Sequence, residues 1–271
     1  MRRLPPRRSN PFRRKLGRRP LLVHCSHHKA GTMWFRRVLW TLSSSYGLRF
    51  QSCVDEPVAR RTDFAFFRAA PHFHREDLAG RTFRGSHLIR DPRDIVVSGY
   101  FYHLWTEEKW ARQPDGRSWG GLSYQEYLNS VDPAQGLLAE IERAAGSTLA
   151  DLAAWDYEQP EFLELRYEDV ITDEPTMFRR LFDFYGFDDK AIAEGLAVAE
   201  KVSIHSGGPD GLQKPRRHVR SGKTAQWRQH FGAEHVALFK ELTGGLLVDL
   251  GYESDSEWSS ESSDARTEEE D

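Results

Sequence analysis

The stretch LLVHCSHHKAGTMWFRRVLWTL, residues 21–42, carries the strongest signal in the chain. Its short apolar run Leu21–Cys25 predicts a buried strand. From Thr32 the apolar residues recur at a helical period, with Thr32 as the expected N-cap and Gly47 as the expected stop. The loop around Lys29–Thr32 would then direct backbone N–H groups, a helix N-terminus and a lysine toward one place. Such an arrangement binds an anion, most often a phosphate.

Length and composition favour one large domain. At 271 residues, with 39% hydrophobic and 12% aromatic residues, the chain can bury a sizeable core. Its two cysteines, Cys25 and Cys53, form neither a disulfide framework nor a metal-ligand cluster, so both are expected to be reduced and structural. The sequence has no run of about 20 apolar residues that predicts a membrane anchor. No apolar segment follows the first arginines as in a secretory signal. These features favour a cytoplasmic protein without a metal site.

The net charge of −3 conceals two oppositely charged ends. Residues 1–20 contain eight arginines and Lys15 with no acidic residue, which gives +9, and residues 252–271 contain nine acidic side chains and Arg266, which gives −8. Both segments are poor in apolar residues, so we expect a disordered basic arm and a disordered acidic tail around a domain at residues 21–251. The arm could bind an anionic polymer or a membrane surface. A solvated tail is favoured, and no nucleic acid partner is expected.

Strand and helix patterns alternate along the rest of the chain. Strands are expected at Asp63–Ala70, at Gly85–Ile89 and at Glu161–Arg166. Helical patterns occupy, in order, Ile95–His103, Ser123–Leu128, Pro133–Trp155 with a break near Gly146, Thr172–Tyr185 and Ala233–Leu242. Residues 106–122 are expected to form a loop or lid, and residues 203–224 a long loop. The alternation indicates an α/β fold with a mostly parallel sheet, in which ligands bind beyond the carboxyl ends of the strands.

Two further segments carry cations beside predicted elements. In RDPRDIVVS, residues 90–98, Arg90 follows a strand directly and Ser98 lies on the next helix, so the two can hold one phosphate from two sides. Arg93 in the same segment is interpreted as an ion-paired surface residue. The late segment HVRSGKTAQWR, residues 218–228, places two cations and a flexible glycine ahead of an aromatic residue and a helix.

The first loop differs from the P-loop of nucleotide hydrolases, G-x-x-x-x-G-K-[ST]. In the order Lys29-Ala30-Gly31-Thr32 the lysine precedes the glycine, and no hydroxyl follows the lysine directly to hold Mg²⁺. A P-loop kinase with Asp91 as the magnesium ligand is therefore a disfavoured alternative. A non-catalytic module that binds nucleic acid or an acidic polymer through residues 1–20 is a second alternative.

Together these segments resemble the signature of sulfotransferases that use 3′-phosphoadenosine 5′-phosphosulfate (PAPS). Residues 29–34, KAGTMW, resemble the family's 5′-phosphosulfate loop, and residues 90–98 resemble its 3′-phosphate motif. Residues 220–227, RSGKTAQW, resemble its late R-K-G segment, and residues 166–170, RYEDV, resemble the segment after a central strand. The four matches fall in the family's order over roughly residues 20–231.

The resemblance implies a fold and an activity. The fold would be a three-layer α/β fold with a mostly parallel central sheet flanked by helices, like that of P-loop NTPases. The activity would be metal-free, in-line transfer of a sulfuryl group from PAPS, as co-substrate, to a hydroxyl or amine of a small-molecule or glycan acceptor. The acceptor itself and the oligomeric state stay open.

Position by position, the resemblance assigns co-substrate binding to these residues: Lys29, Ala30, Gly31, Thr32, Met33, Trp34, Arg90, Ser98, Tyr167, Arg220, Ser221 and Gly222. Lys29 and the loop amides would hold the 5′-phosphosulfate, and Lys29 would also stabilise the leaving phosphate. Trp34 would stack on adenine, although core packing is the alternative for it, and Tyr167 would meet the polar edge of the base. Ala30 and Met33 stand where the family usually has hydroxyl residues.

The acceptor also needs a base, and the resemblance implies a histidine after the second strand. His72 and His74 are the candidates, with a preference for His72. If the strand at Asp63–Ala70 continued past Pro71, period-2 alternation would place both on one face. His27 and His28 are weaker candidates, since a buried histidine with satisfied hydrogen bonds is expected for one of them. Some relatives use a glutamate, which stays open.

An aromatic stretch follows the second motif. It comprises residues 100–105, YFYHLW, together with Trp110 and Trp119. The resemblance implies that this region borders the acceptor pocket, as it often does in the family. An aromatic wall would suit a flat or apolar acceptor or a sugar face. Core packing is the expected alternative for about half of these residues.

Overall fold

The computed structural model describes residues 11–12, 19–53, 56–78, 80–114, 118–203 and 222–260. These residues belong to two compact units, which we describe separately. The first unit takes its residues from Met1–Arg90 and Trp155–Gly222, and the second from Asp91–Ala154 and Lys223–Asp271.

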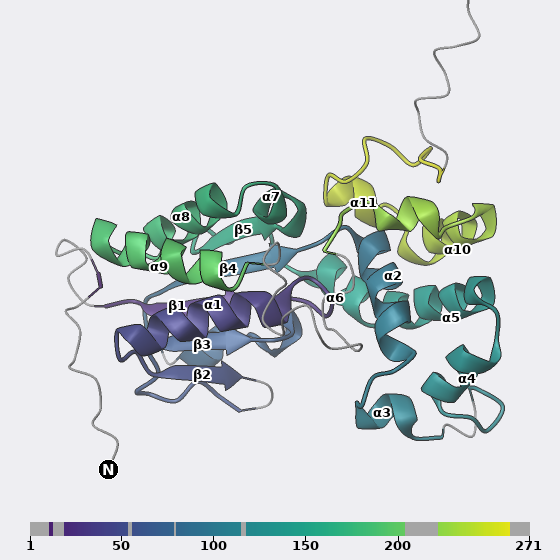
Figure 1. Cartoon of the computed structure of the whole chain (residues 1–271), viewed down its shortest axis with the longest axis horizontal. Coiled ribbons are helices and arrows are strands. Elements are labelled where there is room, and N and C mark those ends of the chain that lie inside the picture. Colours follow the sequence, from purple (N-terminus) through teal and green to yellow (C-terminus); the bar gives the residue numbers. More distant parts are fainter. Residues whose placement is uncertain are drawn as a thin grey trace, which may run out of the picture. The chain divides into compact units, whose positions relative to one another are not determined.

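A five-stranded sheet forms the centre of the first unit (Figure 1). Its strands are β1 (Leu21–Cys25), β2 (Phe50–Cys53), β3 (Phe64–Phe67), β4 (Phe83–Ile89) and β5 (Phe162–Arg166), in the spatial order β2-β3-β1-β4-β5. Every pair of neighbouring strands in this sheet is parallel. The carboxyl ends of the strands therefore meet at one edge, which is where ligands of such sheets bind.

The helices of the first unit cover one face of this sheet. They are α1 (Thr32–Ser45), α7 (Tyr167–Thr172), α8 (Glu174–Phe184) and α9 (Asp189–Lys201). The larger apolar cluster joins side chains of α1, α8 and α9 to strand residues such as Leu22, Phe66 and Leu165. Figure 1 shows these three helices on the same side of the sheet. Burial of this cluster is the main stabilisation of the unit, since apolar area removed from water contributes about 25 cal/mol per Å².

A second apolar cluster lies on the opposite face. It joins strand residues such as Val23, Cys25 and Phe162 to Leu78 and to the partly buried Phe73 and Trp155. Two short 3₁₀ helices, η2 (Ala70–His72) and η3 (Arg75–Leu78), supply part of this cover. Both cysteines, Cys25 and Cys53, are buried free thiols, and burial raises the pKa of each.

Helices make up the second unit. They are α2 (Pro92–His103), α3 (Lys109–Arg112), α4 (Tyr124–Ser130), α5 (Pro133–Ala145), α6 (Thr148–Ala154), η4 (Gln226–Gln229), α10 (Ala233–Thr243) and α11 (Leu246–Asp249). Local signals explain their starts: Ser123 and Glu126 form a capping box at α4, and Asp132 caps α5. Gly146 follows α5, as the expected break requires.

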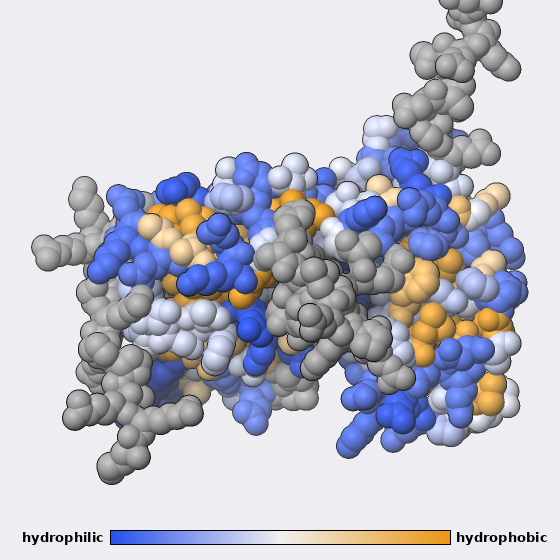
Figure 2. Space-filling model, in the orientation of Figure 1, coloured by the Kyte–Doolittle hydropathy of each residue, from blue (hydrophilic) through white to orange (hydrophobic). Residues whose placement is uncertain are grey.

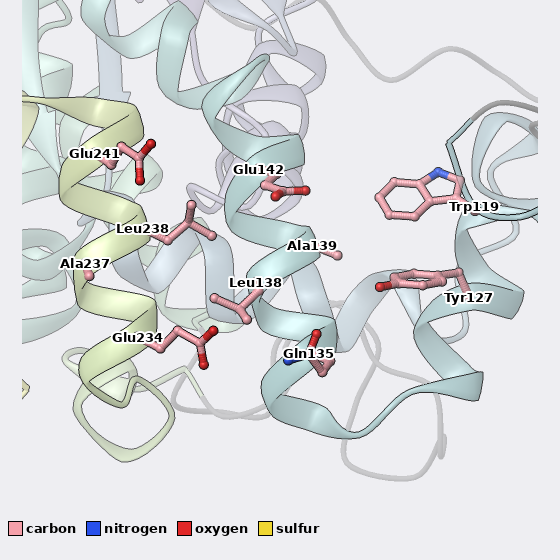
Figure 3. Close-up of a pocket in the computed structure, with 10 residues that line it drawn as sticks. All are labelled: Trp119, Tyr127, Gln135, Leu138, Ala139, Glu142, Glu234, Ala237, Leu238 and Glu241. Carbon is pink, nitrogen blue, oxygen red and sulfur yellow. The ribbon is translucent and has the colours of Figure 1, made fainter.

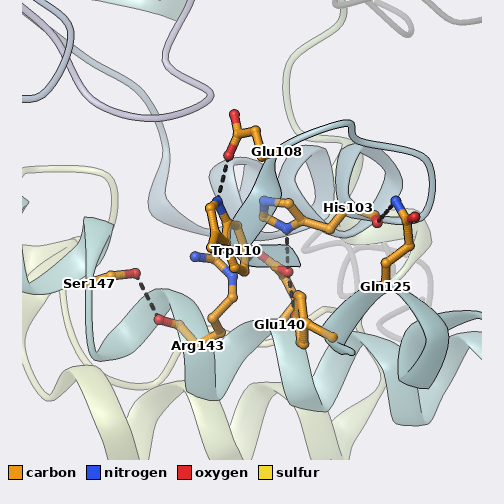
Figure 4. Close-up of polar contacts among 8 residues, drawn as sticks. His103, Glu108, Trp110, Gln125, Glu140, Arg143 and Ser147 are labelled. Atoms are coloured by element: carbon orange, nitrogen blue, oxygen red, sulfur yellow. Dashed lines mark hydrogen bonds and ion pairs between the residues drawn. The ribbon is translucent and has the colours of Figure 1, made fainter. Parts of the chain in front are cut away.

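A buried carboxylate holds three elements of this unit together. Glu140 on α5 is fully buried and pairs with His103 of α2 at 2.8 Å and with Arg143 at 2.6 Å (Figure 4). The hydroxyl of Tyr124, on α4, donates to the same carboxylate at 2.6 Å. Burial alone would raise the pKa of Glu140, but His103 and Arg143 outweigh it and lower the pKa to about 2.

The structure confirms the α/β class and the parallel sheet, and it corrects several boundaries. The second expected strand is short, ending at Phe67, because residues 70–72 turn into a 3₁₀ helix. Gly31, rather than Thr32, is the N-cap of α1. The sequence patterns did not identify β2, α7, α9 and α11, and the expected loop at 106–122 contains α3.

Short pieces of both charged ends are packed. Phe12 is buried against Phe187 at a ring-centroid distance of 5.3 Å. Trp258 contacts Trp227 and Phe239, so the segment expected to be disordered from residue 252 makes contacts as far as this tryptophan. The remaining residues of the two ends, 1–10, 13–18 and 261–271, lie outside the described residues, as do 204–221 of the long loop. No helix in the described ranges is long and apolar enough to span a membrane.

Glu140→Ala should destabilise the protein strongly. The substitution leaves Arg143 without its buried anion, and breaking a buried ion pair from one side costs about 3–5 kcal/mol. The exposed Glu142, on the same helix, provides the matched control, because Glu142→Ala removes a carboxylate that is in water. Urea unfolding of both variants measures the difference. Equal losses for the two would contradict the structural role of Glu140.

The same carboxylate predicts how acid destabilises the protein. The pKa of Glu140 is about 2 in the folded state against an ordinary 4.5, so the unfolded chain takes up the proton first as the pH falls. The stabilisation by Glu140 is therefore complete above pH 4.5 and is lost as the pH falls toward 2. Unfolding free energies measured across this range should fall less steeply for Glu140→Ala than for the wild type. Parallel curves would show that Glu140 does not carry this acid dependence.

Candidate active site

The loop after β1 forms an open helix N-terminus. Lys29 and Gly31 both have positive φ, 65° and 94°, so the chain turns sharply between β1 and α1. Among the described residues, no side chain caps α1. The Thr32 hydroxyl instead donates to the carbonyl of His27 at 2.8 Å and contacts the Ser26 hydroxyl at 2.9 Å, which holds the turn closed. The first amides of a 14-residue helix are thus available to an anion.

Three of the four sequence motifs come together at this loop. Arg90, directly after β4, donates from Nη1 to the carbonyl of Lys29 at 3.2 Å. The Arg90 guanidinium lies over the ring of Tyr167, 4.6 Å from its centroid. A Cβ atom on Gly31 would lie 3.0 Å from Cδ2 of the same ring. The residues predicted from separate motifs are therefore in contact.

Trp34 packs in the core of the first unit. Its side chain is only 2% exposed, and it meets Phe35, Tyr167 and Phe178 edge-on at interplanar angles of 85°. This burial favours the core-packing alternative over stacking on adenine. The indole Nε1–H has no hydrogen-bond partner among the described residues, although it is buried. An unpaired buried donor is costly, and it lies on the first turn of α1.

A chain of polar side chains, buried except for the partly exposed Glu164, lies on the sheet face opposite α1. His27 Nε2 lies 2.8 Å from His87 Nε2, and His87 Nδ1 lies 2.6 Å from Glu164 Oε2. Trp155 donates from Nε1 to Glu164 Oε1 at 3.0 Å and stacks on His87 with ring centroids 4.0 Å apart. Burial lowers the pKa of both imidazoles, that of His87 to about 3, and raises the pKa of Glu164 to about 7.

The sequence patterns missed His87 and Glu164 and ranked His27 low. The available signal was the two-residue period of the strands: His27 continues the face of Val23 and Cys25 beyond β1, and Glu164 shares a face with Phe162. Parallel neighbours in register, with His87 opposite Cys25 and Glu164 opposite His87, bring these side chains together. That register is visible only once the sheet order is known.

The two histidines preferred as bases lie after β3, but not on an extended strand. The expected continuation past Pro71 is wrong, because Ala70–His72 is a 3₁₀ helix. His72 is half-buried and His74 is exposed, so the alternation argument for a shared face does not apply. The backbone N–H of Ala70 donates to the carbonyl of Ser26 at 2.8 Å, which ties this segment to the end of β1.

The rest of the second motif belongs to the second unit. Arg93 is buried rather than on the surface, and it pairs with Asp91 at 2.8 Å and with Glu253. The Asp91 carboxylate accepts the backbone N–H and two guanidinium hydrogen bonds of Arg93. These bonds give Asp91 a structural role as the N-cap of α2. Ser98 lies partly buried on the same helix.

The late basic segment lies mostly outside the described residues. Arg220 and Ser221 are not described, whereas Gly222 has a φ of 66° and Lys223 is exposed. Trp227, in η4 of the second unit, is buried, and its backbone N–H donates to Asp94 at 3.0 Å. The Arg93 guanidinium lies 3.8 Å from the centroid of the Trp227 ring.

A groove of about 420 Å³ lies in the second unit (Figure 3). It is lined by Trp119, Tyr127, Gln135, Leu138, Ala139, Glu142, Glu234, Ala237, Leu238 and Glu241. Figure 2 shows apolar surface over α5 in this part of the molecule. Of the aromatic residues expected near an acceptor, Trp119 lines this groove, Trp110 is 45% exposed and Tyr100 is buried. Among the described residues, no group of three or more His, Cys, Asp or Glu side chains could hold a metal ion.

The five-stranded parallel order and the sharp turn between β1 and α1 define a P-loop-like α/β protein. The family model "Sulfotransferase domain" matches residues 84–251, more than half of the chain. The chain therefore belongs to the sulfotransferase family. The matched region begins within β4, so the Lys29 loop precedes it.

Individual relatives agree with this family. Sulfotransferase 2A1 of Rattus norvegicus is 30% identical over 174 residues, which is 58% of this chain and 54% of the relative. The chain spans about half the length of the curated relatives it matches. Mouse sulfotransferase SULT7A1, solved in complex with PAP, superposes with a TM-score of 0.57 at 15% identity, covering 87% of this chain and 88% of that one. At such identity the structural likeness shows the fold alone.

Gly31→Ala should destabilise the first unit. An alanine at φ 94° is strained by about 1–2 kcal/mol, and its Cβ would also press against the Tyr167 ring. Gly47 is the matched control, since it has a φ of 67° and no atom within 4 Å of an added Cβ. Thermal or urea unfolding should show a larger loss for Gly31→Ala than for Gly47→Ala. Equal losses would mean that the contact with Tyr167 is not tight.

Proposed function

We propose that the protein transfers a sulfuryl group from PAPS to a hydroxyl or amine of a small-molecule or glycan acceptor. The observation that carries this proposal is the meeting of Lys29, Gly31, Arg90 and Tyr167 at the carboxyl edge of the sheet. Membership of the sulfotransferase family supports the same reaction. So do the solved relatives described with PAP, among them a retinol dehydratase in complex with retinol and PAP, at a TM-score of 0.53 and 17% identity over 86% of this chain and 82% of that one.

The donor groups at this edge suit an adenosine carrying phosphates at both ends. The uncapped first turn of α1 offers backbone N–H groups to the 5′-phosphosulfate, with Lys29 beside them. Arg90 offers a fork of N–H donors that matches a 3′-phosphate. The sequence resemblance adds Ser98, Arg220, Ser221 and Gly222 to the residues proposed to bind this phosphate. Tyr167 is held under Arg90 and faces the loop. Trp34 contributes packing beneath the loop.

The chemistry follows from the charges at the loop. PAPS supplies the activated sulfuryl group when it is bound. In an in-line transfer negative charge grows on the leaving phosphate oxygen, and Lys29 with the α1 amides would stabilise it. This role is filled by a side-chain cation and a helix N-terminus, so no metal ion is part of the proposal. A base is also needed for the acceptor proton.

The two alternative functions are less well supported. In a kinase of the P-loop type Asp91 would hold magnesium, but its carboxylate is engaged by the main chain and guanidinium of Arg93. A non-catalytic module would depend on the arginines of residues 1–20. Magnesium-dependent ATP hydrolysis would favour the kinase, and loss of all ligand binding on deletion of residues 1–20 would favour the module.

Arg90→Ala should weaken the binding of 3′-phosphoadenosine 5′-phosphate far more than the binding of adenosine 5′-phosphate. Hydrogen bonds to a charged group contribute about 1.5–3 kcal/mol, so the loss should be roughly 10- to 150-fold for the nucleotide with the 3′-phosphate. Arg49 is the matched control, because it pairs with Asp63 at the amino ends of the strands, away from the proposed site. Calorimetric titration and thermal protection measure both nucleotides on each variant.

Two results would contradict the proposal. If 3′-phosphoadenosine 5′-phosphate gave the wild type no thermal protection, the assignment of PAPS as co-substrate would be wrong. If Arg90→Ala reduced the affinity for both nucleotides equally, Arg90 would not bind the 3′-phosphate. A screen of hydroxyl and amine acceptors with ³⁵S-labelled PAPS then identifies the acceptor class.

A further inference from the structure

We propose that residues 252–258, which we call the C-terminal strap, position Arg90 for the 3′-phosphate of the co-substrate. The strap acts through Arg93, a buried arginine that pairs both with the strap and with the start of α2. Glu253 and Trp258 are the positioning residues of the strap, because they act on Arg93 and not on the nucleotide. This inference rests on the proposed function and deepens it, since it names what holds a ligand of the 3′-phosphate in place.

Arg93 is enclosed by two carboxylates and two aromatic rings. Its side chain is only 3% exposed, and its guanidinium pairs with Asp91 at 2.8 Å and with Glu253. The guanidinium carbon lies 3.8 Å from the centroid of the Trp227 ring and 4.8 Å from that of the Trp258 ring. Arginine suits these surroundings, because its planar fork pairs with carboxylates and stacks on aromatic faces. Since Asp91 begins α2 and Glu253 and Trp258 belong to the strap, Arg93 links the two.

The strap is fixed at both of its ends. At its start, the backbone N–H groups of Tyr252 and Glu253 donate to the carbonyl of Leu247, at 2.7 and 3.2 Å. At its end, the ring of Trp258 packs edge-on against that of Phe239, with the ring centroids 5.8 Å apart. The strap is therefore a packed part of the second unit.

A single tryptophan explains why this charged segment packs. Trp258 is the only apolar residue in 253–264, where all other residues are serine or acidic. Its ring is partly buried, and the Lys240 ammonium lies 5.1 Å from its centroid, in addition to the guanidinium of Arg93. An aromatic ring removes a large apolar area from water when it packs, and cations over its face add attraction. Trp258 thus specifies where the strap lies.

Asp91 carries the constraint from Arg93 to Arg90. Its carboxylate accepts the backbone N–H of Arg93 at 2.9 Å and two guanidinium hydrogen bonds at 3.0 and 2.8 Å. Asp91 is the N-cap of α2, with a φ of −47° and a ψ of 117°. Because a planar peptide bond joins Asp91 to Arg90, these torsion angles set the direction in which the chain passes from Arg90 into α2.

The loss of either strap contact weakens this junction. Without the charge of Glu253, the buried guanidinium keeps only Asp91 of its two carboxylates. Without the Trp258 ring, water reaches the guanidinium, which then gains by turning outward. A buried cation is stable only while its pairing is complete, so both changes loosen the grip of Arg93 on Asp91.

Glu253→Gln and Trp258→Ala, each made in the full chain, test the inference. Both should weaken the binding of 3′-phosphoadenosine 5′-phosphate by about 2- to 30-fold, the range for residues that influence a site without touching its ligand. The binding of adenosine 5′-phosphate should change little, because this nucleotide has no 3′-phosphate. A purely structural role would lower both affinities by one factor, since partial unfolding reduces the competent fraction for both nucleotides alike. Calorimetric titration measures the ratio of the two affinities.

Two further variants sharpen the comparison. Glu257→Gln is the matched control, because Glu257 lies in the same strap but is exposed and accepts a hydrogen bond from Ser256, at 3.2 Å. Its affinity ratio should equal that of the wild type. Trp258→Phe keeps an aromatic ring beside Arg93 and should restore most of the ratio that Trp258→Ala loses. If Trp258→Ala does not fold, Glu253→Gln decides, because it keeps the ring and the side-chain shape.

A double substitution shows whether the effect passes through Arg90. In Arg90→Ala, a second change of Glu253→Gln should cost little further affinity for 3′-phosphoadenosine 5′-phosphate, because the residue that the strap positions is gone. Additive losses would overturn the inference, and so would a wild-type affinity ratio in both Glu253→Gln and Trp258→Ala. In those cases the wild type still binds the nucleotide, and the proposed function stands. If the wild type did not bind it, the proposed function would be wrong, and the inference with it.

Discussion

The close approach of the Lys29–Gly31 turn to Tyr167 constrains the whole carboxyl edge of the sheet. Only a hydrogen fits on Gly31 without pressing on the Tyr167 ring, and Arg90 covers that ring while donating to the carbonyl of Lys29. The ends of β1, β4 and β5 are therefore held against one another. Because the Thr32 hydroxyl is used inside the turn, the first amides of α1 are free to meet a ligand. The proposed anion site is thus a consequence of how the loop packs.

The two faces of the sheet carry two different buried histidine networks. On the face covered by α1, His24 bonds Ser86, Ser86 bonds Tyr185, and Tyr185 donates to the carbonyl of Val23, so the network ends on the main chain. On the other face the chain from His27 ends on Glu164, whose side chain reaches the surface. A network that closes on a carbonyl has no group that can store a proton. The second network instead ends on a carboxyl whose pKa burial raises to about 7.

The motifs predicted the edge of the sheet better than its interior. Lys29, Gly31, Arg90 and Tyr167 come together as expected, because parallel strands bring their carboxyl ends to one edge. The buried polar side chains of the interior were not predictable in the same way. His72 depended on a strand that ends early, and the His27–His87–Glu164 chain depends on strand order and register, which no local pattern encodes. Arg93 was expected on the surface because its partner Glu253 and the ring of Trp227 are far away in sequence.

Two departures from the family pattern become understandable from burial. Ala30 has no exposed surface, so a hydroxyl at that position would face protein and would need a partner there. Met33 is partly buried, and its sulfur accepts a weak bond from Arg68 at 3.9 Å. Neither substitution removes a main-chain N–H from the first turn of α1, and Lys29 and Arg90 keep their charges. The donors that the proposed site requires are thus backbone groups and cations, which these changes leave in place.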